Sequence, residues 1–345
     1  MKIGLVSTAV PLVNGGGRFI VEWLYEKLLE RGHAVEIVYI PYVDAMDHIL
    51  PQMASIRLMK LDDYFERIIT IRPPAHVVRH PRKVVWFIHH IRIFYDLWQT
   101  QYCSVRDDAA GRALRAAVIS ADNVALGEAH KVFTNSRVVG DRMRHFNRLD
   151  SRVLYPPVLR PELFRAGDYG PEIVSVCRME HHKRQHLLIE AMAHTRTPVR
   201  LRLCGTSLSP DYIPNLRNMA RHLGVAERVT IEDRWITEEE KADRLEHALA
   251  SAYLPFDEDS YGYPTIEAAH ARRCTITVTD SGGVPEFVED GVTGFVTEPN
   301  PVAVAEAFDR LYSNRALARA MGEQAAARVA DMGIDWDTVV ARLLE

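Results

Sequence analysis

In the first half of the chain, a stretch with the hydrophobic spacing of a helix lies between short apolar runs typical of strands. Apolar residues recur every fourth position from Ile20 to Leu28, the spacing of one helix face, and Gly32 suits the position after a helix. Short apolar runs on either side predict strands. The run Val84–Ile88 is apolar throughout, as in a parallel strand buried on both faces. The strands predicted here are residues 3–6, 35–40, 84–88 and 131–134.

The alternation stops at Tyr155-Pro156-Pro157 and resumes after Gly167–Pro171, so this glycine- and proline-rich stretch predicts a linker. Beyond it the predicted strands are residues 173–177, 200–204, 229–232, 252–256 and 275–279, and the predicted helices include 185–194, 238–250 and 264–271. Strands that alternate with helices predict parallel sheets covered on both faces.

We therefore expect an α/β protein with two doubly wound, Rossmann-like domains that face a central cleft. The domains are expected over residues 1–165 and 166–330, and a C-terminal helix over 331–345 is expected to pack back towards the first domain.

Composition fits an ordinary soluble globular protein, since 47% of the 345 residues are hydrophobic and 26% are charged. The net charge of −4 argues against nucleic acid as a partner. The four cysteines contain no CxxC pair, so neither a zinc site nor a disulfide framework is expected. The N-terminus lacks the pattern of a signal peptide, and no apolar run approaches the ~20 residues that span a bilayer. We expect a cytoplasmic protein, either free or peripheral at the inner face of the membrane.

The segment Asp257–Glu267 is the richest in residues that could bind a ligand. It follows a predicted strand and opens a helix, with Pro264 in the first turn, where a missing N–H costs nothing. Glu267 then lies near the positive end of the helix dipole. Such a terminus can hold a phosphate while the carboxylate accepts hydrogen bonds from sugar hydroxyls. Spacing alone fits equally well an acid that only favours the start of the helix.

A basic segment, Cys177–Arg184, also lies between a predicted strand and a helix. Arg178 could bind a diphosphate through its guanidinium fork and Lys183 as a point charge, although a solvated basic loop is the simpler interpretation. The adjacent His181-His182 pair lacks the partners of a believable metal site.

Two other segments are weaker candidates. The glycines of Ser281-Gly282-Gly283 allow a backbone to approach a ligand closely, or they form a simple turn. His89 and His90 end the strand at 84–88, where a histidine can contact a substrate, whereas a core or surface position is commoner.

Two familiar motifs match only superficially. Asp257-Glu258-Asp259 is similar to the Asp-x-Asp motif of single-domain, metal-dependent sugar transferases, but it lies late in the chain, in a second α/β block. The turn Gly15-Gly16-Gly17 is not a GxGxxG, and Glu36, about 20 residues later, falls inside a predicted strand. We expect neither a metal nor a dinucleotide cofactor.

In this order, the segments resemble those of the retaining glycosyltransferases of family four, which have the GT-B fold. The resemblance covers nearly the whole chain, and an acidic-Tyr-Gly-Tyr run together with a histidine after Trp86-Phe87-Ile88 is similar to bacterial polysaccharide-assembly members. It rests on Gly15–Gly17, Glu30–Val35, Tyr155–Val158, Val174–Lys183, Leu187–Ala191, Asp259–Glu267, Ser281–Glu286 and Gly291–Phe295.

The resemblance implies an acceptor-binding first domain, a donor-binding second domain and a role for each matching residue. Glu267 would bind the ribose of the nucleotide, and Asp259 would contact the donor sugar. Arg178 and Lys183 would neutralise the diphosphate in place of a metal, and His89 would lie near the acceptor and the anomeric carbon. The other donor-binding residues implied are Gly15, Gly16, Arg234, Trp235, Glu258, Tyr261, Gly262, Tyr263, Pro264 and Thr265.

Two departures from the family pattern leave details open. The family commonly has two glutamates separated by seven residues, and that spacing puts Asp259 in the first position, with Glu258 one place further away as a rival. Cys177 stands where the family often has glycine before the phosphate-binding arginine.

The implied function is metal-independent transfer of a hexose from a UDP- or GDP-linked donor to a hydroxyl of a sugar or lipid-linked sugar, in polysaccharide or glycolipid assembly. Retention would follow from a same-face substitution assisted by the leaving phosphate. The alternatives are a nucleotide-sugar epimerase or hydrolase of the same fold, and a two-domain sugar-binding protein without catalysis.

Charge is distributed unevenly along the chain. Residues 1–170 contain 23 Lys and Arg against 18 Asp and Glu, whereas residues 171–345 contain 19 against 28. The basic half could face an anionic membrane or a lipid-diphosphate acceptor, and a solvated surface explains the same numbers. The basic residues considered for this face are Arg79, Arg82, Lys83, Arg137, Arg142, Arg144 and Arg148.

Overall fold

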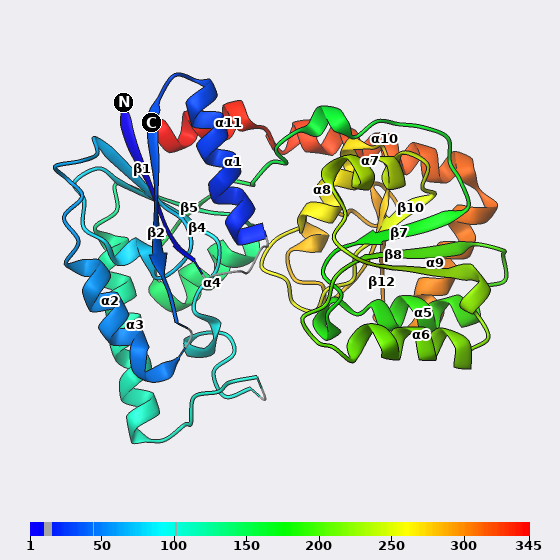
Figure 1. The fold of residues 1–345 in the computed structure, drawn as a ribbon, viewed down its shortest axis with the longest axis horizontal. Coiled ribbons are helices and arrows are strands. Elements are labelled where there is room, and N and C mark those ends of the chain that lie inside the picture. The colour runs from blue at the N-terminus through cyan, green and yellow to red at the C-terminus, as the bar shows by residue number, and fades with distance from the viewer. Residues whose placement is uncertain (10–15, 44, 101) are drawn as a thin grey trace. The chain divides into compact units, whose positions relative to one another are not determined.

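The computed structural model describes residues 1–9, 16–43, 45–100 and 102–345. The chain divides into two compact units, one of Met1–Pro156 with Ile334–Glu345 and the other of Pro157–Gly333. Each unit contains one six-stranded parallel sheet flanked by helices (Figure 1). The change from the first unit to the second falls inside the proline-rich segment at 155–157, and the last helix belongs to the first unit.

The sheet of the first unit has the strand order β2-β1-β3-β4-β5-β6. Its strands are β1 (Lys2–Ala9), β2 (Ala34–Pro41), β3 (Arg67–Thr70), β4 (Lys83–Phe87), β5 (Lys131–Thr134) and β6 (Arg152–Val153). Its helices are α1 (Gly16–Glu30), α2 (Ile49–Arg57), α3 (Ala109–Gly127), α4 (Arg137–Asn147) and α11 (Trp336–Leu344). Ile3 lies between Val35 of β2 and Arg67 of β3, so β1 is buried inside the sheet.

The sheet of the second unit has the order β12-β11-β10-β7-β8-β9. Its strands are β7 (Glu172–Val176), β8 (Arg200–Gly205), β9 (Val229–Asp233), β10 (Ala250–Ala252), β11 (Thr275–Val278) and β12 (Gly294–Thr297). Its helices are α5 (Gln185–His194), α6 (Tyr212–His222), α7 (Glu238–Glu246), α8 (Tyr263–His270), α9 (Pro301–Ser313) and α10 (Arg315–Asp331).

Successive residues of β7 point into opposite layers of this unit. Ile173 belongs to the core cluster that includes side chains of α5, α6 and α9, whereas Val174 packs with α7 and α8. This alternation follows from the two-residue period of a strand, and it leaves both faces of the sheet covered. The expected α/β class with doubly wound parallel sheets is confirmed.

One predicted strand is misplaced. Residues 252–256 were expected to form a strand, but β10 is Ala250–Ala252. Pro255 has no N–H for a ladder, and the guanidinium of Arg184 binds the carbonyl oxygens of Leu254 and Pro255 at 2.7 and 2.8 Å. The chain therefore leaves the sheet early and forms a loop. Within the described residues, no helix is long and apolar enough to cross a membrane.

Candidate functional site

The segments singled out in the second half of the sequence meet at one edge of the second sheet. All six strands are parallel, so their carboxyl ends lie together. The loops after β7, β9, β10 and β11 leave from this edge, which is where open α/β sheets bind ligands. We call this edge the donor edge, after the donor-binding role that the sequence resemblance implies for the second domain.

Lys183 is buried at the donor edge, in a short 3₁₀ helix of residues His181–Lys183. Its ammonium donates to the hydroxyl of Tyr253 at 2.8 Å and forms an ion pair with Glu258, whose carboxylate also accepts from Tyr253 at 2.9 Å. Burial favours the neutral acid at Glu258, but the Lys183 charge and hydrogen bond outweigh it and lower the pKa of that carboxyl. An ammonium has three N–H groups, so one donor remains for a ligand.

Arg184 fixes the loop that follows β10. Its backbone is left-handed, with φ of +56°, which turns the chain from the 3₁₀ helix into α5. Its guanidinium binds both carboxylate oxygens of Asp280, at 2.7 and 2.9 Å, in addition to the two carbonyls given above. Four of the five N–H donors of Arg184 thus join its own loop to the loops after β10 and β11, which gives this arginine a structural role.

Three glycines allow these loops to approach one another. At Gly262, with φ of +69°, a Cβ would overlap the ring of Tyr253. At Gly282 and Gly283 it would overlap the backbone of Glu258 and Ser260, and the Gly283 N–H donates to the Glu258 carbonyl at 2.8 Å. The glycine pair therefore supports the acidic loop directly.

Arg178 is exposed, and its guanidinium has no hydrogen-bond or ion-pair partner among the residues that the structure describes. Its carbonyl accepts from Gln185 at 3.0 Å, and Gln185 also contacts the sulfur of Cys177. The backbone at Cys177 is close to that of Gly205, where a Cβ would overlap the Cys177 carbonyl. Arg178 is therefore a free cation on a fixed backbone, in the segment that also carries Lys183.

Glu267 lies in α8 and is only 2% exposed. Lys241 of α7 donates to its Oε1 at 2.6 Å and to Glu238 at 2.8 Å. Burial raises the pKa of Glu267, and the Lys241 charge opposes that rise. The second carboxylate oxygen of Glu267 has no hydrogen-bond partner within the described part of the chain. Lys241 therefore keeps one buried oxygen paired and leaves the other for a ligand.

Arg234 and Trp235 follow β9 and precede α7. The two terminal guanidinium nitrogens of Arg234 donate to Glu240, at 3.0 and 2.7 Å. This pairing, with a backbone hydrogen bond from Thr237, lowers the pKa of Glu240 to about 2. Glu240 also completes a capping box with Thr237 at the start of α7. Trp235 is 55% exposed.

The remaining predicted residues surround the first turn of α8. Asp259 is half-buried, while Tyr261 and Thr265 are buried, and the Thr265 hydroxyl donates to the Tyr261 carbonyl at 2.7 Å. Pro264 lies in the first turn, and Tyr263 begins the helix after Gly262. The two acids that compete for the first donor-site position therefore have different surroundings, since Glu258 forms the ion pair with Lys183.

His89 and His90 belong to the first unit, directly after β4. The His89 Nδ1–H donates to the His90 carbonyl at 2.7 Å, and burial lowers its pKa to about 4, so its Nε2 is an acceptor at neutral pH. His90 is buried, is hydrogen-bonded to Asn147 at 2.9 Å and packs against the rings of Phe87 and Tyr95. Each histidine thus has one ring nitrogen without a hydrogen-bond partner in the described part of the chain, Nε2 of His89 and the buried Nδ1 of His90.

The glycine turn is described only in part. Gly15 lies outside the described residues, and Gly16 is the exposed first residue of α1. In the described ranges, no group of three or more His, Cys, Asp or Glu side chains is placed to hold a metal ion.

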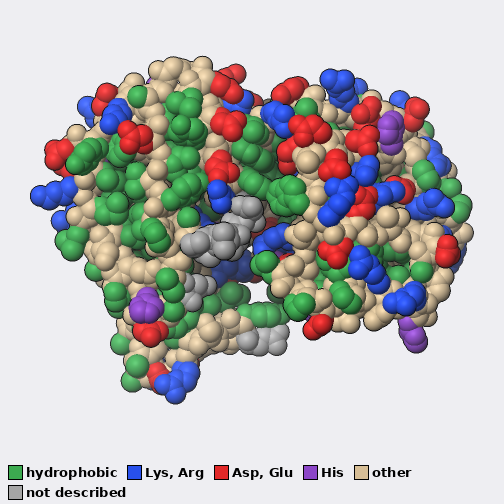
Figure 2. All heavy atoms as spheres, viewed as in Figure 1, with side chains coloured by type: hydrophobic (Ala, Val, Ile, Leu, Met, Phe, Trp, Pro, Cys, Tyr) green, Lys and Arg blue, Asp and Glu red, His purple; other side chains and the backbone are tan. Residues whose placement is uncertain are grey.

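The basic set of the first half is partly internal. Lys83 is fully buried, and its ammonium donates to the carbonyls of His76, Val78 and Ala125 at 2.8 to 3.0 Å. It therefore cannot contribute to a basic face. Arg142 and Arg144 form ion pairs with neighbouring aspartates. On the face shown in Figure 2, Lys and Arg are interspersed with Asp and Glu.

Sequence reasoning missed two residues of the donor edge. Lys241 follows three glutamates in an acidic helix and resembles a solvated side chain, but it is brought to Glu267 by the packing of α7 on α8. Tyr253 was assigned to a strand, although its hydroxyl joins Lys183 and Glu258. The sequence signal available was the adjacency of Tyr253 to the acidic loop.

Comparison with known proteins assigns the second unit to a family. Residues 164–328 match the family described as Glycosyl transferases group 1. The chain is 25% identical over 286 residues to the human alpha-1,3/1,6-mannosyltransferase ALG2. The matched stretch covers 74% of this chain and 66% of ALG2.

A second relative is the GDP-mannose-dependent alpha-(1-6)-phosphatidylinositol monomannoside mannosyltransferase of Mycobacterium tuberculosis, 31% identical over 205 residues, covering 55% of this chain and 51% of that enzyme. The chain thus spans about two thirds of the first relative and about half of the second.

The fold of the whole chain also has solved counterparts. HepE from Anabaena, crystallised with UDP and glucose, matches 99% of this chain and 98% of its own with a TM-score of 0.72 at 18% identity. This likeness shows the shared fold, and the family match covers the unit that carries the donor edge. Residues 164–328 therefore match the group 1 glycosyltransferase family, and the whole chain has the GT-B fold that it shares with solved structures such as HepE.

Proposed function

We propose that the protein transfers a sugar from a nucleoside-diphosphate donor to an acceptor hydroxyl, with retention at the anomeric carbon. One observation carries the proposal. The same sheet edge holds the buried carboxylate of Glu267, with one oxygen unpaired among the described residues, and the two cations Arg178 and Lys183. Glu267 would bind the ribose, while Arg178 and the remaining donor of Lys183 would bind the diphosphate. UDP is named with HepE and GDP-mannose with the mycobacterial relative, so both nucleotides are donors to test.

The chemistry proposed is charge stabilisation at the leaving group. Negative charge builds on the diphosphate as the glycosidic bond breaks, and fixed cations stabilise it where it develops. Arg178 can bind phosphate through its fork and Lys183 as a point charge. These cations would act in place of a metal ion. Asp259 would contact the donor sugar, and the Nε2 acceptor of His89 would face a hydroxyl of the sugar or the acceptor.

The acceptor is proposed to be a sugar or a lipid-linked sugar in polysaccharide or glycolipid assembly, bound by the first unit. Peripheral contact with an anionic membrane would then rest on the exposed Arg79, Arg82, Arg137 and Arg148. Co-sedimentation with vesicles of 30% anionic lipid at low and high salt tests this contact. Equal binding to neutral vesicles would reject it.

The first experiment is a thermal-shift screen with UDP, GDP and their sugar conjugates in excess EDTA. A ligand at 100 times its Kd stabilises the native state by about 2.7 kcal/mol, so the cognate nucleotide is expected to raise Tm clearly. Transfer is then assayed with that donor, still in EDTA, and the anomeric configuration of the product is determined by NMR. Loss of transfer in EDTA that Mn²⁺ restores would reject the metal-independent mechanism.

Product analysis separates the alternatives. A transferase leaves the donor nearly intact until an acceptor is added. Donor consumed at full rate without acceptor would identify an epimerase or hydrolase instead, and binding of free sugar without any nucleotide would identify a non-catalytic sugar-binding protein.

A further inference from the structure

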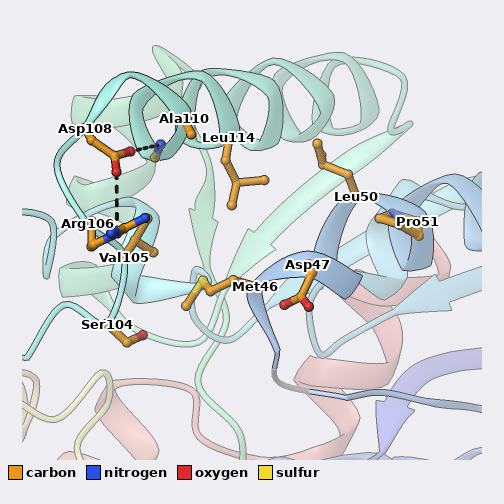
Figure 3. A pocket seen from close by; sticks show the side chains of 11 residues that line it. Met46, Asp47, Leu50, Pro51, Ser104, Val105, Arg106, Asp108, Ala110 and Leu114 are labelled. Carbon is orange, nitrogen blue, oxygen red and sulfur yellow. Dashed lines mark hydrogen bonds and ion pairs between the residues drawn. The ribbon is translucent and has the colours of Figure 1, made fainter.

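The first unit contains a cavity that none of the residues discussed so far lines. Its volume is about 440 Å³, within the range of small-molecule sites. It lies between the 3₁₀ helix Met46–His48 with α2 on one side, and residues 104–108 with the start of α3 on the other (Figure 3).

The lining of this cavity is largely apolar. Met46 and Leu50 face Val105 and Leu114, and Figure 3 shows Leu114 projecting from α3 into the space. All four side chains are half-buried and pack against the core of the first unit on their inner sides. An apolar group in the cavity would complete the burial of these side chains.

The polar groups of the lining disfavour an anion. Asp47 and Asp108 contribute two carboxylates, and Arg106, the one cation among the described lining residues, is paired with Asp108 at 3.4 Å. Asp108 also accepts the Gly111 N–H at 2.8 Å as the N-cap of α3, and this hydrogen bond lowers its pKa, so it stays ionised. A phosphate would meet net negative charge here, whereas a neutral group would leave the Arg106–Asp108 pair intact.

Part of the cavity lining lies on the same chain connection, between β4 and α3, as His89. His89 follows β4 and Ile88, and the same connection from β4 to α3 contributes Ser104, Val105, Arg106 and Asp108 to the lining. Large apolar side chains are exposed on both bordering segments, Val43 at 57% and Tyr102 at 56%. The connection between β4 and α3 thus contains His89, which is proposed to contact the sugar, and part of the apolar cavity lining.

We propose that this cavity binds an uncharged alkyl or aryl group attached to the acceptor sugar. The identification of the ligand as an acceptor rests on the proposed glycosyl transfer, whereas the apolar, uncharged chemistry rests on the lining alone. The site would select acceptors by what is joined to the sugar, through burial of hydrocarbon against Met46, Leu50 and Leu114.

The test is methyl NMR of the full chain, with ¹³C-labelled Met, Leu and Val methyls, titrated with hexyl β-glucoside, methyl β-glucoside and hexyl phosphate. The hexyl glucoside is expected to shift the methyls of Met46, Leu50, Val105 and Leu114 and to bind about 10- to 100-fold more tightly than the methyl glucoside, since each buried methylene contributes several-fold. No shift at these methyls would overturn the site. Tighter, salt-sensitive binding of hexyl phosphate would overturn its uncharged character.

Two variants fill the cavity from opposite sides, Leu114→Trp and Leu50→Trp. Each is expected to weaken hexyl glucoside binding at least about tenfold, while Leu58→Trp on the 80% exposed Leu58 changes nothing. Wild-type affinity in both filled variants would overturn the proposal. UDP and GDP binding is measured on the same samples, so a protein that binds hexyl glucoside at these methyls but no nucleotide would refute the proposed function and retain the cavity site.

Discussion

Two lysines in the second unit hold carboxylates at the donor edge in different ways. Lys183 shares Glu258 with Tyr253, whereas Lys241 lies between Glu238 and the buried Glu267. Burying a carboxylate without a partner is costly, and each lysine favours the ionised form of its acid, although burial still raises the pKa of Glu267. The first lysine still has a donor to offer, and the second leaves an acceptor oxygen on its acid.

Replacing Lys183 tests the role of the buried ammonium. In Lys183→Ala we expect turnover to fall about 10²- to 10³-fold, the loss typical of one preorganised donor to a developing charge. The measurement is kcat with saturating donor, together with Tm to show that the variant is folded. Lys27→Ala, which removes the 2.9 Å ion pair with Glu30 on α1, is the control. Near-wild-type turnover in Lys183→Ala would remove this lysine from the mechanism.

Replacing Lys241 tests whether it keeps Glu267 ionised. Burial and Glu238 both raise the pKa of Glu267 and Lys241 lowers it, so Lys241→Met should raise that pKa further. Nucleotide binding to the ionised acid is then lost at neutral pH and recovers as the pH rises. The measurement is the Kd of UDP or GDP from pH 5.5 to 9 in the variant and the wild type.

The conservative variant Lys241→Arg is expected to keep the wild-type pH midpoint of binding, because it retains the positive charge. A purely structural role makes a different prediction, since distorting α7 would weaken binding equally at every pH. A parallel loss without a shifted midpoint would therefore refute the electrostatic role.

The start of α8 depends on the loop that precedes it. Gly262 is the N-cap, Pro264 follows in the first turn, and the ring of Tyr253 lies against the glycine. A side chain at this cap would push on the same tyrosine that hydrogen-bonds Lys183 and Glu258. The start of α8 and the position of the Lys183 ammonium are therefore coupled through the ring of Tyr253.

Gly262→Ala tests this coupling, with Gly224→Ala as the matched control. Both glycines have nearly the same φ, +69° and +70°, but a Cβ at Gly224 meets nothing within 4 Å. Both variants carry the backbone strain of about 1–2 kcal/mol for left-handed alanine. Only Gly262→Ala should destabilise the fold further and weaken nucleotide binding. Equal effects in urea unfolding and in Kd would show that the Tyr253 contact is irrelevant.

The sequence predicted elements well where local pattern and packing agree. The helix expected at 185–194 is α5 with the same bounds, because residues 187–189, 191 and 192 all belong to one core cluster. Local pattern failed at β3, whose first residue, Arg67, is buried because its guanidinium donates to the Leu343 carbonyl in α11. No local window contains a partner 276 residues away.

The same reason explains which residues of the donor edge the sequence could point to. Glu267, Arg178 and Lys183 lie in segments whose type and order predict a donor site. Lys241 and Tyr253 became visible only when α7 and the loop after β10 were packed together.

The chain as a whole crosses between its units twice, at residues 156–157 and 333–334. After the second crossing, α11 packs on the first unit, where Val339 and Leu343 are fully buried. Glu345 also reaches Lys131 at 3.1 Å. Changes in α11 should therefore be felt in the first unit.

Leu343→Ala tests this assignment, with its half-buried neighbour Leu344 as the matched control. Truncating a fully buried leucine is expected to cost about 2–5 kcal/mol, and Leu344→Ala should cost clearly less. In calorimetry, Leu343→Ala should lower one unfolding transition, and the cognate nucleotide should raise the other. If the nucleotide-sensitive transition moved with Leu343→Ala, α11 would be stabilising the second unit instead.

The position of α11 has a consequence for how the protein is made. A ribosome delivers residues in order, and domains generally fold as units once their residues have emerged. Residues 157–333 are complete before residues 334–345 exist, yet the latter belong to the first unit. The second unit can therefore reach its finished state first during translation. The first unit, in which Arg67 needs the Leu343 carbonyl, therefore cannot be completed until α11 has been synthesised.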